Sequence, residues 1–458
     1  MGLDGLALRR RAFMAGTLSS IGLGATSVAR ARPGVENHTL TVAPADIELA
    51  PGIMRRVLAY NGQVPGPTLR LREGVPVDIM VRNRSASPEL VHWHGLHIPP
   101  FPDGAEEEGS GVIRPGETLR YSFTPNPSGT RWYHTHTMAM MDFSRALYGG
   151  LFGFLIVEPT RDPGRYDREE LLAVHHWDAS LAHTSSSPEL CAMLRYGFAT
   201  FNGQLMSAAE PIRVRKGERV LFRFLNASAT ETVSLSLSGH RFTVVALDGN
   251  PVATPHFVSI LTLGVAERVD AIVEMDQPGQ WVLGPVDPAL RAAGLGRVVE
   301  YADIPRGAPV WRQPERDDWD YGLFGGTAQT SARTIRYDGI FPMLFERHID
   351  AQGMERWTIN GKSGSELPPL SVRKGGRYLF RWMNLSGCAH PLHLHRHNFT
   401  LLARSQRRIG AIVKDTVQIG RFDTIEASFI ADNPGDTLFH CHHQLHMDYD
   451  FMQMIRYS

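Results

Sequence analysis

The stretch with the clearest chemical character is His440-Cys441-His442, which lies near the C-terminus and is followed by His446. Alternate side chains of a β-strand point to opposite faces. A metal bound by Cys441 would therefore lie on one face, and metals bound by His440 and His442 on the other. Two metal centres would then be joined by a path of a few covalent bonds. The stretch predicts electron transfer between two metal sites.

Three further groups of closely spaced histidines accompany this stretch. They are His92-Trp93-His94, His134-Thr135-His136 and His390-Pro391-Leu392-His393-Leu394-His395. In each His-x-His pair the two imidazoles share one face of a strand, which suits two ligands of one metal or of adjacent metals. A single pair of this kind is common without a metal, but four groups together indicate a metal centre.

The ligand types favour copper as the metal. Cys441 with His390 and His446 is the thiolate and two-imidazole set typical of a blue-copper electron-transfer site. The other histidines of the four groups form an imidazole-rich site that also suits copper. Zinc accepts such ligands but has no redox chemistry, so it would leave the His-Cys-His connection without a purpose.

A threefold repeat predicts the elements that must position these residues. Tyr60-Asn61-Gly62, Phe201-Asn202-Gly203 and Ile359-Asn360-Gly361 open similar segments, whose spacing is that of whole domains rather than of a solenoid. Short alternating segments that end in turn signals, such as Phe242–Leu247 before Asp248-Gly249, are typical of strands. We therefore predict an all-β chain of three tandem Greek-key β-sandwich or barrel domains.

Length and charge set the outline of the chain. It has 458 residues, and we place its domains at 36–160, 165–302 and 335–458, with a connector at 303–334. Lys+Arg and Asp+Glu balance at 47 each, which indicates neither nucleic acid nor an anionic membrane as partner. Three complete domains need no second chain to build the predicted site, so a monomer is expected.

Residues 1–31 are typical of an export signal. Arg9-Arg10-Arg11 precedes a short run of apolar or small residues, Met14–Val28, and Ala29-Arg30-Ala31 is an A-x-A cleavage site. That run is too short for a membrane span, and no later stretch is long enough either. The arginines indicate the twin-arginine (Tat) route, which exports folded proteins to the periplasm or the medium. An ordinary Sec signal or a basic amphipathic start is the alternative.

The four histidine motifs, in this order, resemble those of the multicopper oxidases, the family of laccases, cuprous oxidases and ascorbate oxidase. The resemblance runs from about residue 40 to the C-terminus and implies three cupredoxin-like domains with four coppers per chain. It implies a type 1 copper bound by His390, Cys441 and His446, and a type 2 copper bound by His92 and His393. It assigns the type 3 pair to His94, His134, His136, His395, His440 and His442.

The resemblance also implies a mechanism. A donor near the type 1 copper gives up one electron at a time, and each electron passes through Cys441 to His440 or His442. Four electrons reduce dioxygen to two waters, which also needs protons. Asp103, in Pro102-Asp103-Gly104, matches a family acid beside the type 2 and type 3 coppers; otherwise it is a turn aspartate before glycine.

Other polar residues are interpreted as structural. Glu106-Glu107-Glu108 predicts a solvated loop. The second domain has no histidine motif, and its family-like segments, Gly239–Phe242 and Ala266–Asp270, need only a scaffold role. Several histidines are expected to support the ligands, to lie on the surface or to be structural: His97, His397, His443 and the His175-His176 pair.

Phe451 is the main departure from the family pattern. It stands ten residues after Cys441, where many bacterial relatives have the axial methionine of the type 1 copper. Phenylalanine cannot bind a metal, so we predict a three-coordinate site that favours Cu(I) and has a raised reduction potential. The adjacent Met452 points the other way on a strand. Met447 stands where some cuprous oxidases have a carboxylate.

Other sulfur-containing residues leave alternatives open. Met138, Met140 and Met141 follow His136 in a stretch with helical character, and packing is favoured over Cu(I) binding. Three cysteines do not make a disulfide framework. With Cys441 as a ligand, we expect Cys191 and Cys388 to be buried free thiols, with a disulfide between them as the alternative.

The function expected from the sequence is that of an exported, laccase-like copper oxidase. It would take electrons from phenols or similar reductants and pass them to dioxygen. A cuprous oxidase that serves copper tolerance is the second interpretation, although the chain lacks the methionine-rich insertion of such enzymes. A copper-free cupredoxin scaffold in the cell envelope is the third, and the complete ligand set argues against it.

Overall fold

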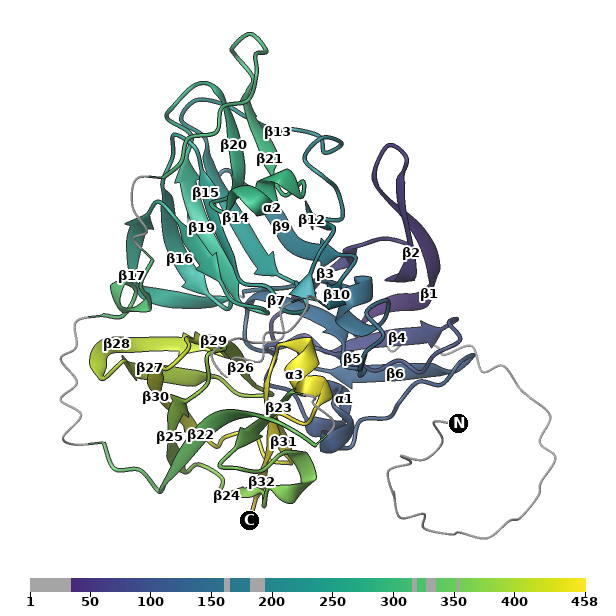
Figure 1. Cartoon of the computed structure of the whole chain (residues 1–458), viewed down its shortest axis with the longest axis vertical. Coiled ribbons are helices and arrows are strands. Elements are labelled where there is room, and N and C mark those ends of the chain that lie inside the picture. Colours follow the sequence, from purple (N-terminus) through teal and green to yellow (C-terminus); the bar gives the residue numbers. More distant parts are fainter. Residues whose placement is uncertain (1–33, 160–164, 182–193, 315–318, 327–334, 352–354) are drawn as a thin grey trace. The chain divides into compact units, whose positions relative to one another are not determined.

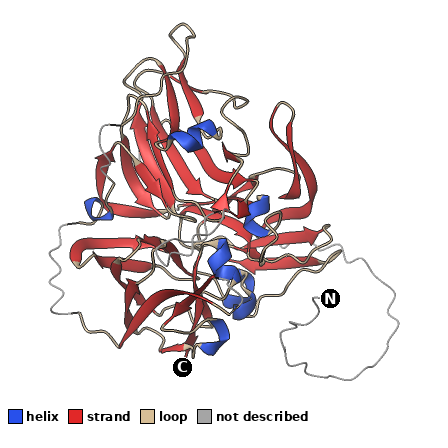
Figure 2. Ribbon diagram, viewed as in Figure 1, coloured by secondary structure: helices blue, strands red, loops and turns tan. Residues whose placement is uncertain are grey.

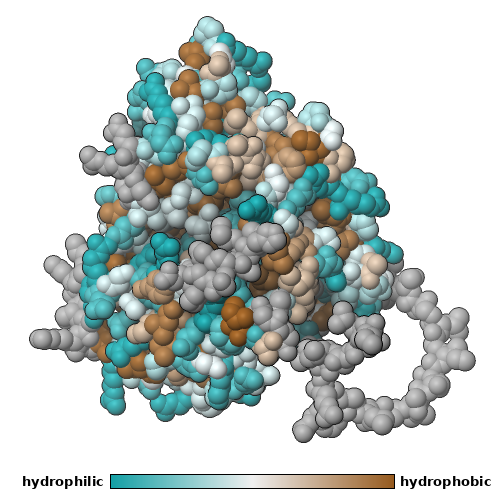
Figure 3. Space-filling model, in the orientation of Figure 1, coloured by the Kyte–Doolittle hydropathy of each residue, from teal (hydrophilic) through white to brown (hydrophobic). Residues whose placement is uncertain are grey.

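The computed structural model describes residues 34–159, 165–181, 194–314, 319–326, 335–351 and 355–458. The predicted export signal and Cys191 lie outside these ranges. No helix of the described residues is long and apolar enough to cross a membrane. Hydrophilic and hydrophobic residues are mixed on the face of the molecule seen in Figure 3.

Two four-stranded sheets form the N-terminal part of the fold (Figure 1). The first has the order β2-β1-β4-β6 and consists of β2 (Ile53–Tyr60), β1 (Glu36–Ala50), β4 (Val77–Asn83) and β6 (Thr118–Phe123). The second has the order β3-β8-β7-β5 and consists of β3 (Gly66–Arg72), β8 (Phe152–Glu158), β7 (Gly129–Thr135) and β5 (Val91–His92). Histidines of the first two predicted clusters therefore lie on β5 and β7 or directly after them.

A six-stranded and a five-stranded sheet follow. The larger has the order β12 (Phe198–Phe201), β9 (Arg168–Trp177), β14 (Arg219–Asn226), β19 (Arg268–Glu274), β16 (Phe242–Leu247) and β17 (Asn250–Val258). The smaller has the order β13 (Ile212–Val214), β21 (Arg297–Tyr301), β20 (Gln280–Pro285), β15 (Val233–Leu237) and β18 (Leu261–Leu263). β10 (Ser180–Leu181) and β11 (Leu194–Arg195) form a separate two-stranded ribbon.

The C-terminal part repeats this plan. Its six-stranded sheet has the order β23 (Glu355–Ile359), β22 (Gly339–Ile349), β25 (Arg377–Asn384), β30 (Thr424–Ile430), β27 (Phe399–Arg404) and β28 (Arg407–Lys414). Its five-stranded sheet has the order β24 (Leu370–Val372), β32 (Met452–Tyr457), β31 (Thr437–Cys441), β26 (His390–Leu394) and β29 (Thr416–Ile419). The predicted all-β, cupredoxin-like fold is confirmed, while the domain boundaries stay predictions.

Helices are few and short (Figure 2). They are α1 (Pro100–Asp103), α2 (Pro288–Ala292), α3 (Gln444–Asp448) and the 3₁₀ turns η1 (Glu106–Glu108), η2 (Ala146–Gly149), η3 (Tyr321–Leu323) and η4 (Gly364–Glu366). The helix expected around Met138–Met141 is wrong. These residues form a loop before η2, in which Met140 has a positive φ of 53°, a backbone conformation that ends rather than continues an α-helix.

Local sequence explains why these strands and turns form. In β25 the aromatic residues Tyr378, Phe380 and Trp382 face the core, while Arg381 and Met383 point outward, as the two-residue period of a strand requires. The repeated Asn-Gly pairs make the same tight turn, with φ of 52–53° at each asparagine and 74–75° at each glycine. The threefold sequence repeat is thus a repeat of turn geometry.

Cys388 corrects one expectation. It is disulfide-bonded rather than a free thiol, whereas Cys441 is free and buried. A disulfide was the alternative interpretation of this cysteine. The number of cysteines did not distinguish the two, because pairing depends on which segments the fold brings together.

A buried ion network joins the second and third parts of the fold. Lys414, at the end of β28, lies 3.0 Å from Asp248 and 3.2 Å from Glu267. Asp248 also accepts a hydrogen bond from the backbone nitrogen of Thr416. Asp248 and Glu267 raise the pKa of Lys414 against the opposing effect of burial. The lysine is therefore held as a cation between two carboxylates.

We expect Lys414→Met to destabilise the protein by about 3–5 kcal/mol, because it leaves Asp248 and Glu267 as buried charges without compensation. Denaturant unfolding would show a lower midpoint. Lys216→Met is the matched control, since Lys216 is exposed and its replacement is expected to change stability by less than about 0.5 kcal/mol. Equal midpoints for the wild-type and Lys414→Met proteins would contradict the role given to Lys414.

Candidate metal centres

Cys441, His390 and His446 form one compact site. Cys441 Sγ lies 3.7 Å from His390 Nδ1 and 3.5 Å from His446 Nδ1, and the two nitrogens are 3.1 Å apart. Ligands at about 2.0–2.3 Å from one ion lie about 3.3–3.6 Å from each other at tetrahedral angles. The three groups therefore have the separation of ligands to a single metal ion, and all three are buried.

The chemistry of Cys441 also favours a bound metal. Burial raises the pKa of its thiol, so the free protein holds the neutral form. A metal ion deprotonates a coordinating thiol, and the two contacts of this sulfur are with His390 and His446. Burial lowers the pKa of His390 to about 3. Its imidazole is therefore neutral and has a lone pair for a metal.

The eight remaining histidines of the four motifs converge in a second buried cluster. Three pairs of Nε2 atoms face each other: His92 and His393 at 3.4 Å, His395 and His440 at 3.1 Å, and His134 and His442 at 3.3 Å. His94 Nδ1 and His136 Nε2 have no hydrogen-bond partner. Nitrogens in this arrangement fit shared metal ions, because each pair has the separation of two ligands to one ion.

Hydrogen bonds of the outer ring nitrogens orient these imidazoles. The Nδ1 atoms lie 2.8–2.9 Å from backbone carbonyl oxygens in four of them: His92 to Asp103, His134 to Thr135, His393 to Asp415 and His440 to Cys441. A carbonyl can only accept, so Nδ1 carries the proton and Nε2 presents its lone pair to the cluster. The surrounding backbone thus selects the ligand atom.

His94 is oriented the other way round. Its Nε2 lies 3.1 Å from Asp415 Oδ1, which leaves Nδ1 to face the cluster. Arg268 donates to both oxygens of Asp415, at 2.8 and 2.6 Å, and Arg131 lies 3.4 Å away. Burial alone raises the pKa of Asp415, but the two arginines and His393 outweigh it and hold this pKa well below its ordinary value.

Asp415 was not identified from the sequence, and Arg268 was assigned only to a scaffold. A signal for Arg268 was present, since it lies in the family-like segment Ala266–Asp270. Asp415 gave none, because a lone aspartate after a strand has no distinguishing pattern. The second domain, which supplies no histidine, therefore reaches the cluster through Arg268.

Asp103 lies where the sequence predicted, beside the histidine cluster. Its Oδ2 accepts from His395 Nδ1 at 2.8 Å and lies 3.2 Å from His92 Nδ1. The solvated loop expected at Glu106–Glu108 is wrong for Glu108, which is only 7% exposed. Glu108 Oε1 accepts from the backbone nitrogen of Leu438 and lies 3.6 Å from His395 Nδ1. Three identical residues gave no sign of which one turns inward.

The other candidate residues are not part of either cluster. His175, His176 and His397 are buried, whereas His97 and His443 are half-buried. His443 stacks on His446 with ring centroids 3.7 Å apart. Phe451 is buried beside the Cys441 site, with its ring centroid 4.9 Å from that of His390. Met447 and Met452 pack instead with Ala105 and Leu438.

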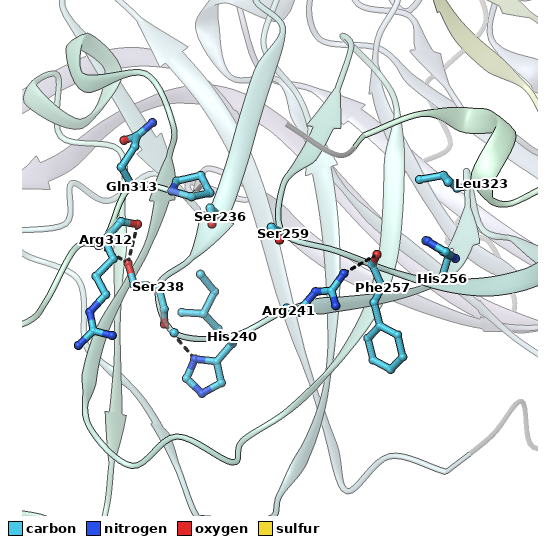
Figure 4. Close-up of a pocket in the computed structure, with 13 residues that line it drawn as sticks. Ser236, Ser238, His240, Arg241, His256, Phe257, Ser259, Arg312, Gln313 and Leu323 are labelled. Carbon is cyan, nitrogen blue, oxygen red and sulfur yellow. Dashed lines mark hydrogen bonds between the residues drawn. The ribbon is translucent and has the colours of Figure 1, made fainter. Parts of the chain in front are cut away.

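A pocket of about 710 Å³ opens elsewhere, in the second part of the fold. Figure 4 shows its polar wall, where Arg241 donates to the Phe257 carbonyl at 3.1 Å and the backbone nitrogen of Arg312 donates to Ser238 Oγ at 2.8 Å. Its lining includes none of the clustered histidines. The pocket is therefore separate from both candidate metal centres.

Comparison with known proteins identifies the family. Three multicopper oxidase models match residues 41–162, 176–285 and 342–458. The multicopper oxidase MmcO of Mycobacterium tuberculosis is 30% identical, and the alignment covers 89% of this chain and 84% of MmcO. The putative laccase-17 of Oryza sativa is 25% identical over 85% of this chain and 87% of its own. A crystal structure of a multi-copper oxidase from Pseudomonas thermotolerans has 27% identity and a TM-score of 0.72, and covers 93% of this chain and 99% of its own.

The chain belongs to the multicopper oxidase family. It is a copper-dependent oxidase, and its buried histidine and cysteine groups fit the copper sites of that family, with four coppers as the matching number. Similar proteins include a laccase, an L-ascorbate oxidase and copper resistance protein A. These names cover more than one kind of electron donor.

We expect Asp415→Ala to weaken copper binding by the eight-histidine cluster by about 10–100-fold, because outer hydrogen bonds fix the orientation of ligating histidines. The measurement is copper content per chain after dialysis against a graded chelator. Asp423→Ala is the control, since Asp423 pairs with Arg404 and contacts no clustered histidine. The blue absorption of the Cys441 site is expected to remain, and unchanged copper retention in Asp415→Ala would refute this role.

Proposed function

We propose that this protein is a laccase-like oxidase that takes electrons from phenols or similar small reductants and passes them to dioxygen, forming two waters. The observation that carries the proposal is the position of Cys441. Its sulfur belongs to the three-residue site, and its two neighbours in the chain, His440 and His442, belong to the eight-histidine cluster. Copper supplies the one-electron steps when it is bound.

Each group of residues has a proposed role. His390, Cys441 and His446 hold the type 1 copper, and His92 and His393 the type 2 copper. The type 3 pair is held by His94, His134, His136, His395, His440 and His442. The facing Nε2 atoms support this division, because each pair, His92 with His393, His395 with His440 and His134 with His442, falls within one proposed set.

Protons for dioxygen reduction are proposed to come through Asp103. Its Oδ2 contacts two cluster histidines, His92 and His395, and its Oδ1 has no partner among the described residues. Glu108 lies next to it and interacts with it, so that a second buried carboxyl can pass a proton to the first. The two acids lie at the edge of the cluster, within 3.6 Å of the Nδ1 atoms of His92 and His395.

The donor is proposed to be organic rather than Cu(I). The chain has no methionine-rich insertion, and Met447, which stands where some cuprous oxidases have a carboxylate, packs in an apolar cluster with Ala105 and Leu438. The names of similar copper resistance proteins favour Cu(I) as the alternative donor. The protein is further proposed to be a monomer that the Tat route exports to the periplasm or the medium.

Oxygen consumption by the copper-loaded protein, with a substituted phenol or with Cu(I) as donor, tests the proposal. We expect the larger kcat/KM with the phenol. Cys441→Ser is expected to lose both the blue absorption and the oxidation of either donor, because the serine oxygen is a poor ligand for this site and breaks the path to His440 and His442. A larger kcat/KM for Cu(I) would favour the interpretation as a cuprous oxidase. The absence of bound copper would favour the interpretation as a copper-free scaffold.

Phe451→Met is expected to lower the reduction potential of the type 1 copper. Phe451 contacts the ring of His390 without offering a ligand atom, and a thioether there would stabilise Cu(II) relative to Cu(I). A redox titration followed at the blue absorption band measures the change. Phe451→Leu, which offers no ligand either, is the control and should keep the potential. The prediction fails if the Met and Leu variants titrate alike.

A further inference from the structure

The first and third domains build their histidine strands in the same register. Two pairs of histidines occupy equivalent positions in these strands: His92 with His134 in β5 and β7, and His393 with His440 in β26 and β31. Gly95 stands three residues after His92, and Arg396 stands three residues after His393. Both have a positive φ, 86° for Gly95 and 60° for Arg396. Arg396 is therefore an arginine in a turn position that the first domain fills with glycine.

The backbone conformation of Arg396 is unfavourable for a residue with a long side chain. Among the described non-glycine residues with a positive φ, Arg396 is the only arginine, and it is 1% exposed. A left-handed conformation brings Cβ close to the following carbonyl oxygen, so a bulky residue keeps it only where the surrounding contacts stabilise it. Strain of this kind is concentrated at functional sites. The contacts of the side chain must therefore explain why an arginine stands here.

The guanidinium group of Arg396 is surrounded by neutral oxygen acceptors. Its three nitrogens donate at 2.7–3.2 Å to five backbone carbonyls and one hydroxyl, which belong to Ile98, Asn433, Pro434, Gly435, Asp436 and Thr437. An arginine side chain has five N–H donors in a planar fork, whereas a lysine ammonium has three donors on one atom. The set of acceptors therefore fits a guanidinium group and not an ammonium group.

These acceptors come from two separate parts of the fold. Residues 433–436 lead into β31, which carries His440, whereas Ile98 belongs to the first domain and follows its first histidine motif. Asn433 strengthens the connection, because its Nδ2 donates to the carbonyls of Ile98 and Arg396 at 2.9 and 3.1 Å. Arg396 thus links the start of a third-domain strand to the first domain.

The two parts approach each other closely at Gly435. A Cβ on this residue would lie 2.5 Å from Pro100 Cγ, so no larger residue fits without a shift. Pro100 begins α1, which ends at Asp103. Asp103 Oδ2 accepts from His395 Nδ1 at 2.8 Å. The contact that Arg396 holds is therefore continuous with the hydrogen bond that orients His395.

Arg396 also acts on both members of one facing pair of cluster histidines. His395 directly precedes it in the chain, and its guanidinium group holds Thr437, the first residue of the strand that carries His440. The Nε2 atoms of His395 and His440 lie 3.1 Å apart, and His136 of the first domain belongs to the same group. A displacement of β31 or of the first domain would separate these three imidazoles.

We propose that Arg396 is a positioning residue of this oxidase, which holds His136, His395 and His440 at the separation that one copper of the cluster requires. Its backbone carries His395, its guanidinium group fixes the strand of His440, and its hydrogen bond to Ile98 fixes the domain of His136. The unfavourable φ is retained because it directs the side chain to these contacts. The role rests on the proposed binding of type 3 copper by these histidines and is independent of the electron donor.

The Cys441 site is held by other contacts. His390 Nε2 lies 3.0 Å from Ser386 Oγ, and the backbone nitrogen of Cys441 donates to the Phe451 carbonyl at 3.1 Å. Loss of the Arg396 side chain is therefore expected to weaken the copper held by the facing histidine pair and to leave the blue type 1 site in place.

The test is copper retention by Arg396→Gly in the copper-loaded protein. Glycine suits the positive φ, and its lack of a side chain leaves a space the size of a guanidinium ion beside the six acceptors. Each protein is dialysed against a graded series of chelator concentrations, and copper per chain and blue absorption are measured. We expect the variant to lose one copper at a chelator concentration about 10–100-fold lower than the wild type, because outer contacts that fix ligands contribute this much to affinity. The blue absorption is expected to remain.

Chemical rescue separates the guanidinium group from the rest of the change. Guanidinium chloride at about 10 mM, far below the molar range in which it unfolds proteins, is expected to restore copper retention to Arg396→Gly, because the free ion can occupy the space. Sodium chloride at the same concentration is the ionic control and should restore nothing. Arg396→Lys keeps the positive charge but lacks the planar fork, so it is expected to lose the same copper and not to respond to guanidinium.

Gln406→Gly is the matched control for the change of backbone preference. Gln406 is exposed and has a φ of 63°, and its replacement should retain copper like the wild type. If Arg396→Gly fails to fold, Arg396→Lys decides. Three results overturn the positioning role: wild-type retention in either Arg396 variant, joint loss of the cluster copper and the blue absorption, or no effect of guanidinium on folded Arg396→Gly. A wild-type protein that binds no copper contradicts the proposed function, and this role with it.

Discussion

Ten imidazoles and one thiol buried together are the constraint on which the rest of this structure depends. Charged imidazolium groups at these separations would repel one another, and burial would penalise each of them. The protein meets this constraint by holding the rings neutral, as the lowered pKa of His136 shows. Backbone carbonyls then accept the outer N–H of several rings, such as His92 and His393. Neutral rings with their lone pairs turned inward are what copper requires.

The second domain has a larger part in this arrangement than its lack of ligands suggests. Arg268 holds Asp415, and Asp415 orients His94. The ion pairs of Lys414 with Asp248 lie in the same region and join the strands that carry these residues. A cluster whose histidines come from two domains needs those domains at a defined separation to bind a metal, because an error of about 1 Å spoils metal geometry. The buried ions are one means by which the fold holds that separation.

The correspondence between the first and third domains shows how one architecture supports different sites. The same strand register carries Cys441 in one domain and Thr135 in the other. With His390 and His446 nearby, the cysteine position becomes part of a candidate metal site. With Glu89 and Tyr60 nearby, the threonine position belongs to a buried group of hydrogen-bonded polar side chains. The fold sets the connection to the histidine cluster, and the side chains set the chemistry.

Sequence patterns predicted the fold class, copper as the metal and the histidines and cysteine that gather in the two buried groups, because strand periodicity and residue spacing are local properties of the chain. The covalent connection between the two candidate sites runs through His440-Cys441-His442, so it could be predicted without tertiary information. Tertiary structure decided what depends on residues far apart in the chain. It buried Glu108 rather than Glu106, linked Asp415 to His94 and placed Tyr60 on Glu89. Such contacts form only when strands far apart in the sequence pack together, so no local sequence pattern could predict them.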